Sequence, residues 1–450
     1  MFRAKFVLSS MVLIFGGLFS ACSLFNFSTA TKKAAPDELF LVSKYNEATK
    51  TSTNGFMDKT GKIVAGPWET FEWNGKKYGT DSYKPLFFEV TPFVEGMAGI
   101  CFYDEVKSSL DTNGKCGFID KTGKIVVEPK YKQISYFSEG LAAVSENGKQ
   151  FGYIDKTGKQ IIEQKFTSES AFSDDLAISY EGFSSLKGYI DKTGKTVIEP
   201  KFLFATSFGD GYAIVTNLSN QKAIIDKTGK EIKTIETESA GNTDYYYQTS
   251  ILRRFYEGYA VDEFSAMPAF NENLTMVHDR GKSLPIGYTN TKGELEIRLD
   301  PTLVGQIRPF SEGFAPIGWE VQDKEKLTAI MGLEAMKDFY DWTYIDRKGN
   351  IKVPLNDTFQ DARPFAEGMA AVKPRPNDKG NWGFINTEFK LVIPACFTKV
   401  SDFRGGLASV IVYSYPKEIK GCEAYDFSEE GSGWAAFYID KTGKAIKPQW

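Results

Sequence analysis

The stretch Gly117-Phe118-Ile119-Asp120-Lys121-Thr122-Gly123-Lys124 decides the fold of this chain, because it returns throughout the sequence. Clear copies begin at Gly152 and Gly188, and others occupy 223–230 and 437–444. The copies recur about every 35 residues, a period typical of tandem-repeat architectures. We therefore expect the 450 residues to form one repeat array rather than several unrelated domains.

Each repeat contains three short apolar segments, which we name strands A, B and C. Strand A follows Phe-Ser-Glu-Gly, as in 141–144, while 152–155 illustrates strand B and 160–163 illustrates strand C. Short runs that are rich in β-branched and aromatic residues and bounded by turn residues predict strands. The sequence therefore predicts an all-β fold of about nine three-stranded antiparallel β-meander units.

The turn between strands B and C is the best-defined part of the repeat. The segment 155–159, Asp-Lys-Thr-Gly-Lys, fits a three-residue hairpin loop with Gly in the left-handed region. The first residue can accept a hydrogen bond from the backbone two residues on, which favours Asp and Asn. The residues at this place are Asp58, Asp120, Asp155, Asp191, Asp226, Asn290, Asp346, Asn386 and Asp440. Phe389 stands where Gly is expected, so the turn of the eighth copy should be strained or rebuilt.

A ladder of aligned acids could also suggest calcium sites. Calcium needs several oxygens that converge from one loop, whereas Asp-Lys-Thr-Gly offers one carboxylate with a cation beside it. Turn formation is therefore the expected role of these acids. We expect neither a metal nor a cofactor, and His278 alone could supply an imidazole ligand.

The pairing of strands B and C predicts that both faces of each sheet are apolar. Pairing across the turn places Tyr153 opposite Ile161. It places Gly152 opposite Ile162. A sheet with one solvated face should alternate apolar and polar residues, so each unit is expected to be covered by its neighbours. Glycines such as Gly152 would mark the close approach of a large residue from the next unit.

The Phe of Phe-Ser-Glu-Gly is predicted to lie in the core in every copy. These residues are Phe93, Phe137, Phe172, Phe208, Phe255, Phe310, Phe365 and Phe403.

Three elements together resemble the bacterial WG repeat family, also called KWG repeats. They are the aromatic-Gly-aromatic-Ile-Asp motif of strand B, the Thr-Gly turn, and Phe-Ser-Glu-Gly-Leu-Ala. The literal Trp-Gly pair is Trp382-Gly383, and the resemblance extends from Leu39 to Trp450. It implies a scaffold with diverse partners. The chain is also similar to the quinoprotein-type propeller blade of non-enzymatic outer-membrane assembly lipoproteins, although the Asp to Thr spacing is one residue shorter here and the closing Trp is absent.

Two arrangements of the units remain open. A propeller blade usually has four strands, whereas three are expected here. The first unit has its own strand A at 39–44, and the last has its own strand C at 445–450, so no exchanged strand locks a ring. We favour units stacked as an open array or spiral, with a closed β-propeller-like ring as the alternative.

The N-terminus predicts export. Arg3 and Lys5 precede the apolar run 6–19, which is short for a membrane span. The segment 18–22, Leu-Phe-Ser-Ala-Cys, resembles the processing site of bacterial lipoproteins. The resemblance implies that Cys22 becomes the first residue and carries lipid, in the cell envelope and at the outer membrane of a cell that has one. An ordinary cleaved signal peptide is the alternative.

Three regions follow from these patterns: a signal peptide at 1–21, a flexible tether at 22–37 and the repeat array at 38–450. The net charge of −4 and the lack of a long basic stretch argue against nucleic acid as a partner. Export permits disulfides among the other four cysteines. Cys101 and Cys116 either form a disulfide across one hairpin or stay free, and a bond between Cys396 and Cys422 is less favoured.

The loop between strands A and B varies most in length. It is extended at 103–115, 263–285, 321–342 and 416–433. Insertions at one junction emerge on one face of a repeat array, often the binding face. Asp323 to Tyr340 is expected to form a short amphipathic helix. The candidate partner-binding residues are Trp319, Phe339, Trp342, Tyr425 and Trp434, although each could instead pack its insertion onto the body.

Three functions remain open at this stage. The favoured one is a non-enzymatic envelope lipoprotein that binds protein or glycan through its A–B loop face. The second is an envelope enzyme that acts on glycan through a pair of carboxylates. The third is a purely structural surface protein. No nucleophile elbow, phosphate-binding loop or zinc motif is present in the sequence.

Overall fold

A computed structural model gives the structure of the chain. It describes residues 39–46, 51–68, 70–73, 76–79, 87–90, 93–103, 114–167, 170–180, 186–235, 245–247, 271–279, 285–300, 302–320, 340–354, 359–375, 381–413, 421–422, 425 and 434–449.

The first five units follow one another along the chain. Unit 1 holds β1 (Phe40–Asn46), β2 (Thr51–Met57) and β3 (Ile63–Trp68), and is followed by a hairpin of β4 (Thr70–Trp73) and β5 (Lys76–Gly79). Unit 2 holds β6 (Phe87–Val90), β7 (Met97–Tyr103), β8 (Gly114–Asp120) and β9 (Ile125–Tyr131). Unit 3 holds β10 (Gln133–Ile134), β11 (Leu141–Ser145), β12 (Phe151–Asp155) and β13 (Gln160–Phe166). Unit 4 holds β14 (Leu176–Ser179), β15 (Lys187–Asp191) and β16 (Thr196–Phe202). Unit 5 holds β17 (Phe204–Ala205), β18 (Tyr212–Thr216), β19 (Lys222–Asp226) and β20 (Glu231–Ile235).

The remaining units repeat the pattern. Unit 6 holds β21 (Tyr245–Tyr247), β22 (Leu274–Asp279), β23 (Pro285–Asn290) and β24 (Leu295–Arg298). Unit 7 holds β25 (Val304–Ile307), β26 (Phe314–Glu320) and β27 (Tyr340–Asp346). Unit 8 holds β28 (Phe359–Ala362), β29 (Met369–Pro374), β30 (Trp382–Asn386) and β31 (Leu391–Phe397). Unit 9 holds β32 (Lys399–Val400), β33 (Leu407–Tyr413), β34 (Trp434–Asp440) and β35 (Ala445–Ile446).

The predicted all-β fold of small antiparallel sheets is confirmed. Seven units have a sheet of their own, and units 7 and 8 share one seven-stranded sheet. Most units carry a short strand in addition to A, B and C, because the chain leaves strand C still extended. β9 ends at Tyr131, for example, and β10 begins at Gln133 and pairs with strand A of the next unit.

Within the described ranges the chain forms no α-helix, and hence no helix that could cross a membrane. Of the segment expected to form a helix, only Tyr340 is described, and it opens β27; residues 323–339 lie outside the described residues.

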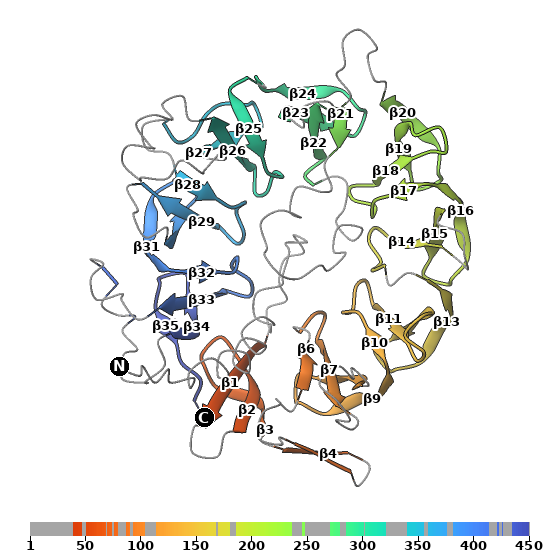
Figure 1. Cartoon of the computed structure of the whole chain (residues 1–450), viewed down its shortest axis with the longest axis vertical. Helices are drawn as coiled ribbons and strands as arrows, with labels where there is room; N and C mark the ends of the chain where they lie inside the picture. The colour runs from red at the N-terminus through yellow and green to blue at the C-terminus, as the bar shows by residue number, and fades with distance from the viewer. Residues whose placement is uncertain are drawn as a thin grey trace, which may run out of the picture.

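The units are arranged around a ring, with unit 1 beside unit 9 (Figure 1). The ring of Phe40 packs edge-on against Tyr438, with centroids 5.1 Å apart, and the Tyr438 hydroxyl donates to the Leu41 carbonyl at 3.2 Å. The backbone amide of Gln449 donates to the Gly61 carbonyl at 2.8 Å. These contacts correct the favoured open array in favour of the ring, since the two ends meet by face packing and need no exchanged strand.

One aromatic contact recurs between successive units. The Tyr153 ring of strand B packs against Phe172 of the next unit with centroids 5.0 Å apart, and its hydroxyl donates to the Ser170 carbonyl at 2.7 Å. The same edge-to-face or tilted pairing joins Phe56 to Phe93, Phe118 to Phe137, Tyr189 to Phe208, Tyr288 to Phe310, Tyr344 to Phe365, and Phe384 to Phe403. Every described Phe of the Phe-Ser-Glu-Gly motif is buried, as predicted, and Phe255 lies outside the described residues.

The Phe-Ser-Glu-Gly turns form a second line of contacts, close to the middle of the ring (Figure 1). Glu139 and Gly140 have φ of 55° and 88°, as a two-residue type I′ hairpin requires. The carboxylate of Glu95 accepts hydrogen bonds from the amides of Glu139 at 2.7 Å and Gly140 at 2.9 Å in the next unit. Lys156 of the Asp-Lys-Thr-Gly turn pairs with the same carboxylate at 3.2 Å. Burial raises the pKa of Glu95, but these hydrogen bonds outweigh it and hold the pKa below its ordinary value.

This carboxylate contact continues along the ring. Glu139, Asp174, Asp210, Glu272, Glu312 and Glu367 each accept from the turn of the following unit. Like Glu95, all of these acids have positive φ. The left-handed backbone costs a non-Gly residue about 1 kcal/mol. The recurring acid therefore serves the contact between units rather than its own turn.

The register of strands B and C differs from the prediction. Tyr153 pairs with Ile162 rather than Ile161, and the register shifts on both sides of Tyr153. Ile162 is 3% exposed and Ile154 is fully buried, whereas Ile161 is 37% exposed. Strand B is thus covered on both faces, but the bulged strand C buries only one.

Gly152 is required by its own unit rather than by the next one. A Cβ at Gly152 would lie 2.4 Å from the Ile162 carbonyl oxygen, and Gly117, Gly188, Gly287 and Gly383 meet strand C in the same way. The backbone of the bulged strand C is therefore the close neighbour that the sequence analysis assigned to the next unit.

We expect Gly152→Ala to destabilise the protein more than Gly140→Ala. The first substitution forces a methyl group into main-chain atoms and should cost about 3 kcal/mol. The second meets no atom within 4 Å and should cost about 1 kcal/mol for its left-handed backbone alone. Urea unfolding of the two variants measures the difference, and equal midpoints would show that the bulge of strand C is misplaced.

Candidate functional site

The aromatic residues predicted to contact a partner do not form one exposed surface. Trp342 in β27 and Tyr425 are buried, and the Tyr425 hydroxyl donates to the Gly443 carbonyl. Trp319 in β26 is partly buried and packs on the core of units 6 and 7. Trp434 begins β34, where only its backbone is described, and Phe339 lies outside the described residues.

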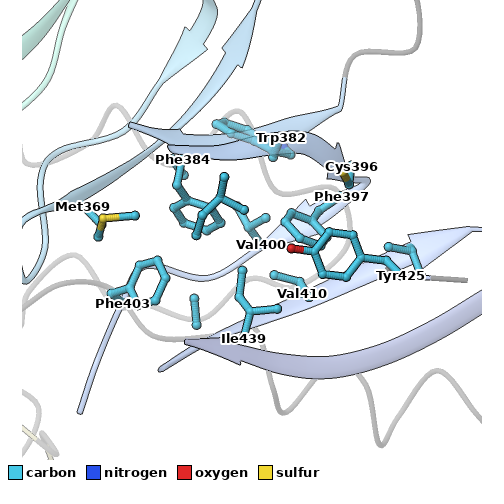
Figure 2. Close-up of a cluster of buried hydrophobic side chains, with 14 of the residues drawn as sticks. Met369, Trp382, Phe384, Cys396, Phe397, Val400, Phe403, Val410, Tyr425 and Ile439 are labelled. Carbon is cyan, nitrogen blue, oxygen red and sulfur yellow. The ribbon is translucent and has the colours of Figure 1, made fainter. Parts of the chain in front are cut away.

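Tyr425 belongs to the core between units 8 and 9 (Figure 2). Its ring packs against Phe397 with centroids 4.9 Å apart and stacks on Phe437 at 5.9 Å. Here the alternative of the sequence analysis holds, because this aromatic residue attaches an insertion to the body.

Long insertions separate strands A and B in units 2, 7 and 9, between β7 and β8, β26 and β27, and β33 and β34. Unit 6 differs from the prediction. Its strand A is β22, so most of the segment 263–285 precedes or forms strand A instead of following it. His278 accordingly lies in a strand rather than in a variable loop.

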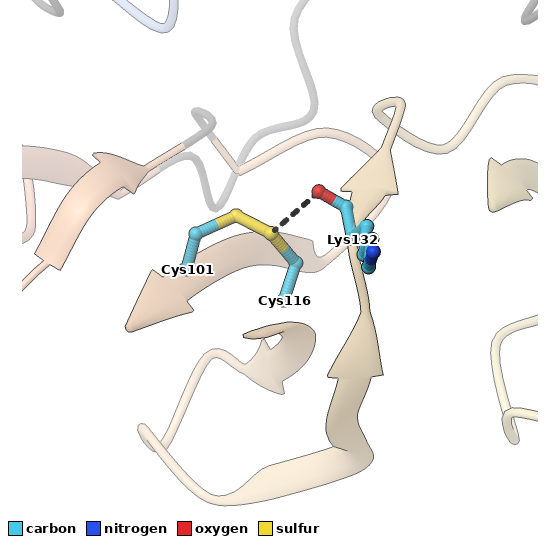
Figure 3. The surroundings of a disulfide bond; sticks show 3 residues. All are labelled: Cys101, Cys116 and Lys132. Atoms are coloured by element: carbon cyan, nitrogen blue, oxygen red, sulfur yellow. Dashed lines mark hydrogen bonds between the residues drawn. A yellow bond between two sulfur atoms is a disulfide. The ribbon is translucent and has the colours of Figure 1, made fainter. Parts of the chain in front are cut away.

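Two disulfide bonds hold the A–B ends of units 2 and 9. Cys101 and Cys116 are directly opposite in β7 and β8 and are bonded to each other (Figure 3). The Lys132 carbonyl oxygen lies 3.9 Å from the Cys116 sulfur, a packing contact because a disulfide sulfur carries no proton to donate. Cys396 in β31 is bonded to Cys422, a pairing that the sequence analysis ranked lower. The sequence could not reveal that Cys422 returns to the neighbouring unit.

The acids of the Asp-Lys-Thr-Gly turns serve as hydrogen-bond acceptors. The Asp155 Oδ1 atom accepts from the Thr157 hydroxyl at 2.6 Å, the Thr157 amide at 2.9 Å and the Lys159 amide at 3.1 Å. The Thr157 hydroxyl contributes most to lowering the pKa of Asp155. No group of three or more His, Cys, Asp or Glu in the described part of the chain is placed to hold a metal.

The repeat is most irregular at the junction of units 7 and 8. Among the described residues unit 7 has no third strand, since Ile351 makes one isolated bridge to Ile345. β27 instead pairs with β28 of unit 8, through Trp342 and Phe359. This pairing produces the seven-stranded sheet.

Phe389 occupies the space left at this junction. It keeps the expected turn with φ of 61°, so the turn is strained rather than rebuilt. Elsewhere the turn Gly packs on strand C of the preceding unit, as Gly194 does on Ile162. Phe389 instead packs against Phe314, with ring centroids 5.0 Å apart, and against Tyr344 at 5.6 Å.

A half-open depression of about 270 Å³ lies beside Phe389. Its lining consists of Lys352, Val353, Pro354, Phe359, Ile385, Glu388, Phe389 and Leu391. The neighbouring Ile351, Leu391 and Val392 are exposed. This depression, whose lining mixes apolar residues with Lys352 and Glu388, is close in size to the smaller ligand pockets of proteins.

Arginines stack on tryptophans at this junction and at the next one, between units 8 and 9. Arg308 lies over the Trp342 ring, with its guanidinium carbon 4.1 Å from the centroid, and pairs with Asp361 of unit 8 at 2.8 Å. Arg363 repeats the arrangement one unit later, over Trp382 at 4.8 Å and beside Asp402 at 3.6 Å. We name these six residues with Lys373 the arginine–tryptophan cluster.

The charged side chains of this cluster are partly shielded from water. Burial raises the pKa of Asp402, against the opposing effect of Arg363. Burial lowers the pKa of Lys373, against the opposing effect of Asp361. The cluster was not predicted from the sequence, although a signal was present: Arg stands two residues before Phe at 308 and 363, where units 3 to 5 have Ser or Thr.

Comparison with protein families supports the predicted repeat. The family model described as "WG containing repeat" matches residues 117–149, 151–178, 188–218, 342–373 and 382–412. The resemblance to WG repeats is thus confirmed for five segments. No curated protein matches the chain.

Similar solved structures are distant. The computationally designed Ika8 protein has 11% identity and a TM-score of 0.35, with 78% of this chain and 97% of that chain covered. BamB from Moraxella catarrhalis has 10% identity and a TM-score of 0.35, with 78% and 94% covered. A eukaryotic initiation factor has 10% identity and a TM-score of 0.36, with 94% and 88% covered.

We expect Phe389→Gly to destabilise the protein although it removes backbone strain. Relief of the left-handed conformation is worth about 1 kcal/mol, whereas loss of the packed ring should cost about 3 kcal/mol. Chemical unfolding should therefore show a net loss of about 2 kcal/mol. Phe389→Asn, which tolerates this backbone but lacks the ring, should lose a similar amount. A stabilised glycine variant would show that Phe389 does not fill the junction.

Proposed function

We propose that the protein is a non-enzymatic binding or scaffolding module of the bacterial cell envelope, and that it holds a partner at the junction of units 7 and 8. The matched WG repeats suit a binding or scaffold module. The observation that carries the proposal is the break in the repeat at this junction. The lack of a third strand among the described residues of unit 7, a strained Phe389 and an open depression occur together there.

The chemistry of the junction supports a contact surface. Arg is enriched where binding energy concentrates, and the side chains of Arg308 and Arg363 are partly exposed here. The depression supplies apolar surface, with Lys352 and Glu388 in its lining. A strained residue that its surroundings hold in place is a frequent mark of functional sites.

The acids of the repeat support a role without turnover. The Asp of the B–C turn and the Glu of the Phe-Ser-Glu-Gly turn accept main-chain hydrogen bonds. A glycosidase needs two carboxyl groups that face one substrate. Carboxylates that are held by main-chain hydrogen bonds suit a rigid scaffold better than they suit hydrolysis of a glycan.

Export with a lipid anchor at Cys22 completes the proposal. The two disulfide bonds suit an oxidising compartment outside the cytoplasm. In the proposed arrangement the signal peptide 1–21 is removed, and the tether 22–37 links the lipid to the ring. The protein is then held at the membrane surface, at the outer membrane where one is present.

Site-specific photocrosslinking in envelope extract tests the binding surface. A benzophenone amino acid replaces Leu391, which is 47% exposed beside the depression, or Leu218 of unit 5, which is 66% exposed. We expect a discrete adduct from position 391 and none from position 218. Equal adducts from both positions, or none from position 391, would argue against the junction as the contact surface.

Cys22→Ser tests the anchor. The intact chain should incorporate labelled palmitate and sediment with membranes, because a thiol is needed to carry the lipid. The variant should lose both properties. Unchanged palmitate labelling of the variant would show that Cys22 does not carry the lipid.

A further inference from the structure

Lys373 is the exception within the arginine–tryptophan cluster. It lies near the end of β29, directly opposite Asp361 in β28. Its ammonium group lies 4.9 Å from the centre of the Trp382 ring. The side chain is only partly exposed, so its charge is held where water is limited.

The acids near Lys373 are already engaged. The Asp361 carboxylate pairs with Arg308 at 2.8 Å, and the Asp402 carboxylate lies beside Arg363 at 3.6 Å. Among the residues that the structure describes, Lys373 has no ion pair and no hydrogen-bond acceptor. Partly buried charges are normally paired, so this ammonium with three donor positions is suited to an anion from outside.

Arg363 makes the position more favourable to an anion. Its guanidinium lies over the same Trp382 ring at 4.8 Å, and it lowers the pKa of Lys373 further. Three cations of the cluster, Arg308, Arg363 and Lys373, face two carboxylates, those of Asp361 and Asp402, so one positive charge is left in excess. A carboxylate bound there would relieve the repulsion among the cations and form charge-assisted hydrogen bonds.

We propose that Lys373, with the positive charge of Arg363 beside it, binds a carboxylate from an acidic segment of a partner protein. This proposal rests on the proposed binding function and specifies the chemistry that the junction recognises. A protein is favoured over an acidic glycan because sugars are usually bound against an open aromatic face. Trp382 is 7% exposed and Trp342 is 3% exposed, so neither offers such a face.

Binding of a labelled peptide tests the proposal. The probe is a fluorescent ten-residue peptide of alternating Glu and Gly, and its Gln analogue is the control ligand. Fluorescence anisotropy of the intact mature protein should show binding of the Glu peptide alone. Lys373→Met, which keeps the aliphatic stem on Trp382, should weaken binding about tenfold, as expected for loss of one charge-assisted hydrogen bond. Lys373→Arg should bind nearly as the parent does.

The matched control is Lys149→Met, which removes one exposed lysine charge in unit 3. It should change affinity less than about twofold, because exposed charges are screened. Equal weakening by the two Met variants, or no binding by the parent, overturns the proposal. Tighter binding of polygalacturonate than of the peptide overturns the choice of a protein ligand.

Lysine acetylation of the parent protein provides a readout that needs no variant. The Glu peptide should protect Lys373 from acetic anhydride, as measured by mass spectrometry, and should leave Lys149 unprotected. If the crosslink at position 391 forms while Lys373 stays unprotected, the carboxylate site is wrong and the binding function stands. If neither occurs, both proposals fail.

Discussion

The fold depends on one contact that recurs around the ring, the packing of a strand-B aromatic residue on the Phe that precedes strand A of the next unit. Where strand B supplies Tyr, as at Tyr153, its hydroxyl also donates to a carbonyl of that next unit. Burying the ring stabilises the interface, and the hydrogen bond satisfies the hydroxyl that burial would otherwise leave without a partner. A single unit offers strand B no cover for its second face. The units are therefore stable only together, and at the ring closure Tyr438 of unit 9 is covered by Phe40, which lies in strand A itself.

The repeat period, the strands and the B–C turn could be predicted from the sequence because they are local. Asp155 and Gly158 specify their turn through atoms within four residues. The same local reasoning predicted that Phe389 would leave its turn strained or rebuilt, and the structure shows the strained form. The register of strand C could not be predicted, because the bulge opposite Gly152 depends on how two strands accommodate each other. Ring closure was also out of reach, since it joins residues as distant as Tyr438 and Leu41.

The exposure of the candidate site residues could not be predicted from the sequence either. Aromatic residues beside long loops were candidates either for a partner contact or for packing on the body. Trp342 is covered by Arg308, and Tyr425 lies in the core of units 8 and 9. The residue types in a loop do not show whether an aromatic side chain binds a partner or packs the loop onto the rest of the chain. The irregular junction emerges only when the units are compared in space. There unit 7 has no third strand among its described residues, and the ring of Phe389 fills space at the junction. Lys373 contacts the Trp382 ring but has no ion pair among the residues that the structure describes.

The central claim is that the first and last units meet directly, with the Tyr438 ring of strand B packed on Phe40 of strand A. A double-mutant cycle on the free energy of unfolding tests it, with Phe40→Leu, Tyr438→Leu and the double variant. The account predicts a coupling energy of about 1 kcal/mol, comparable to that of the internal pair Tyr153 and Phe172. Strictly additive effects at Phe40 and Tyr438, alongside clear coupling at the internal pair, would contradict the closed ring.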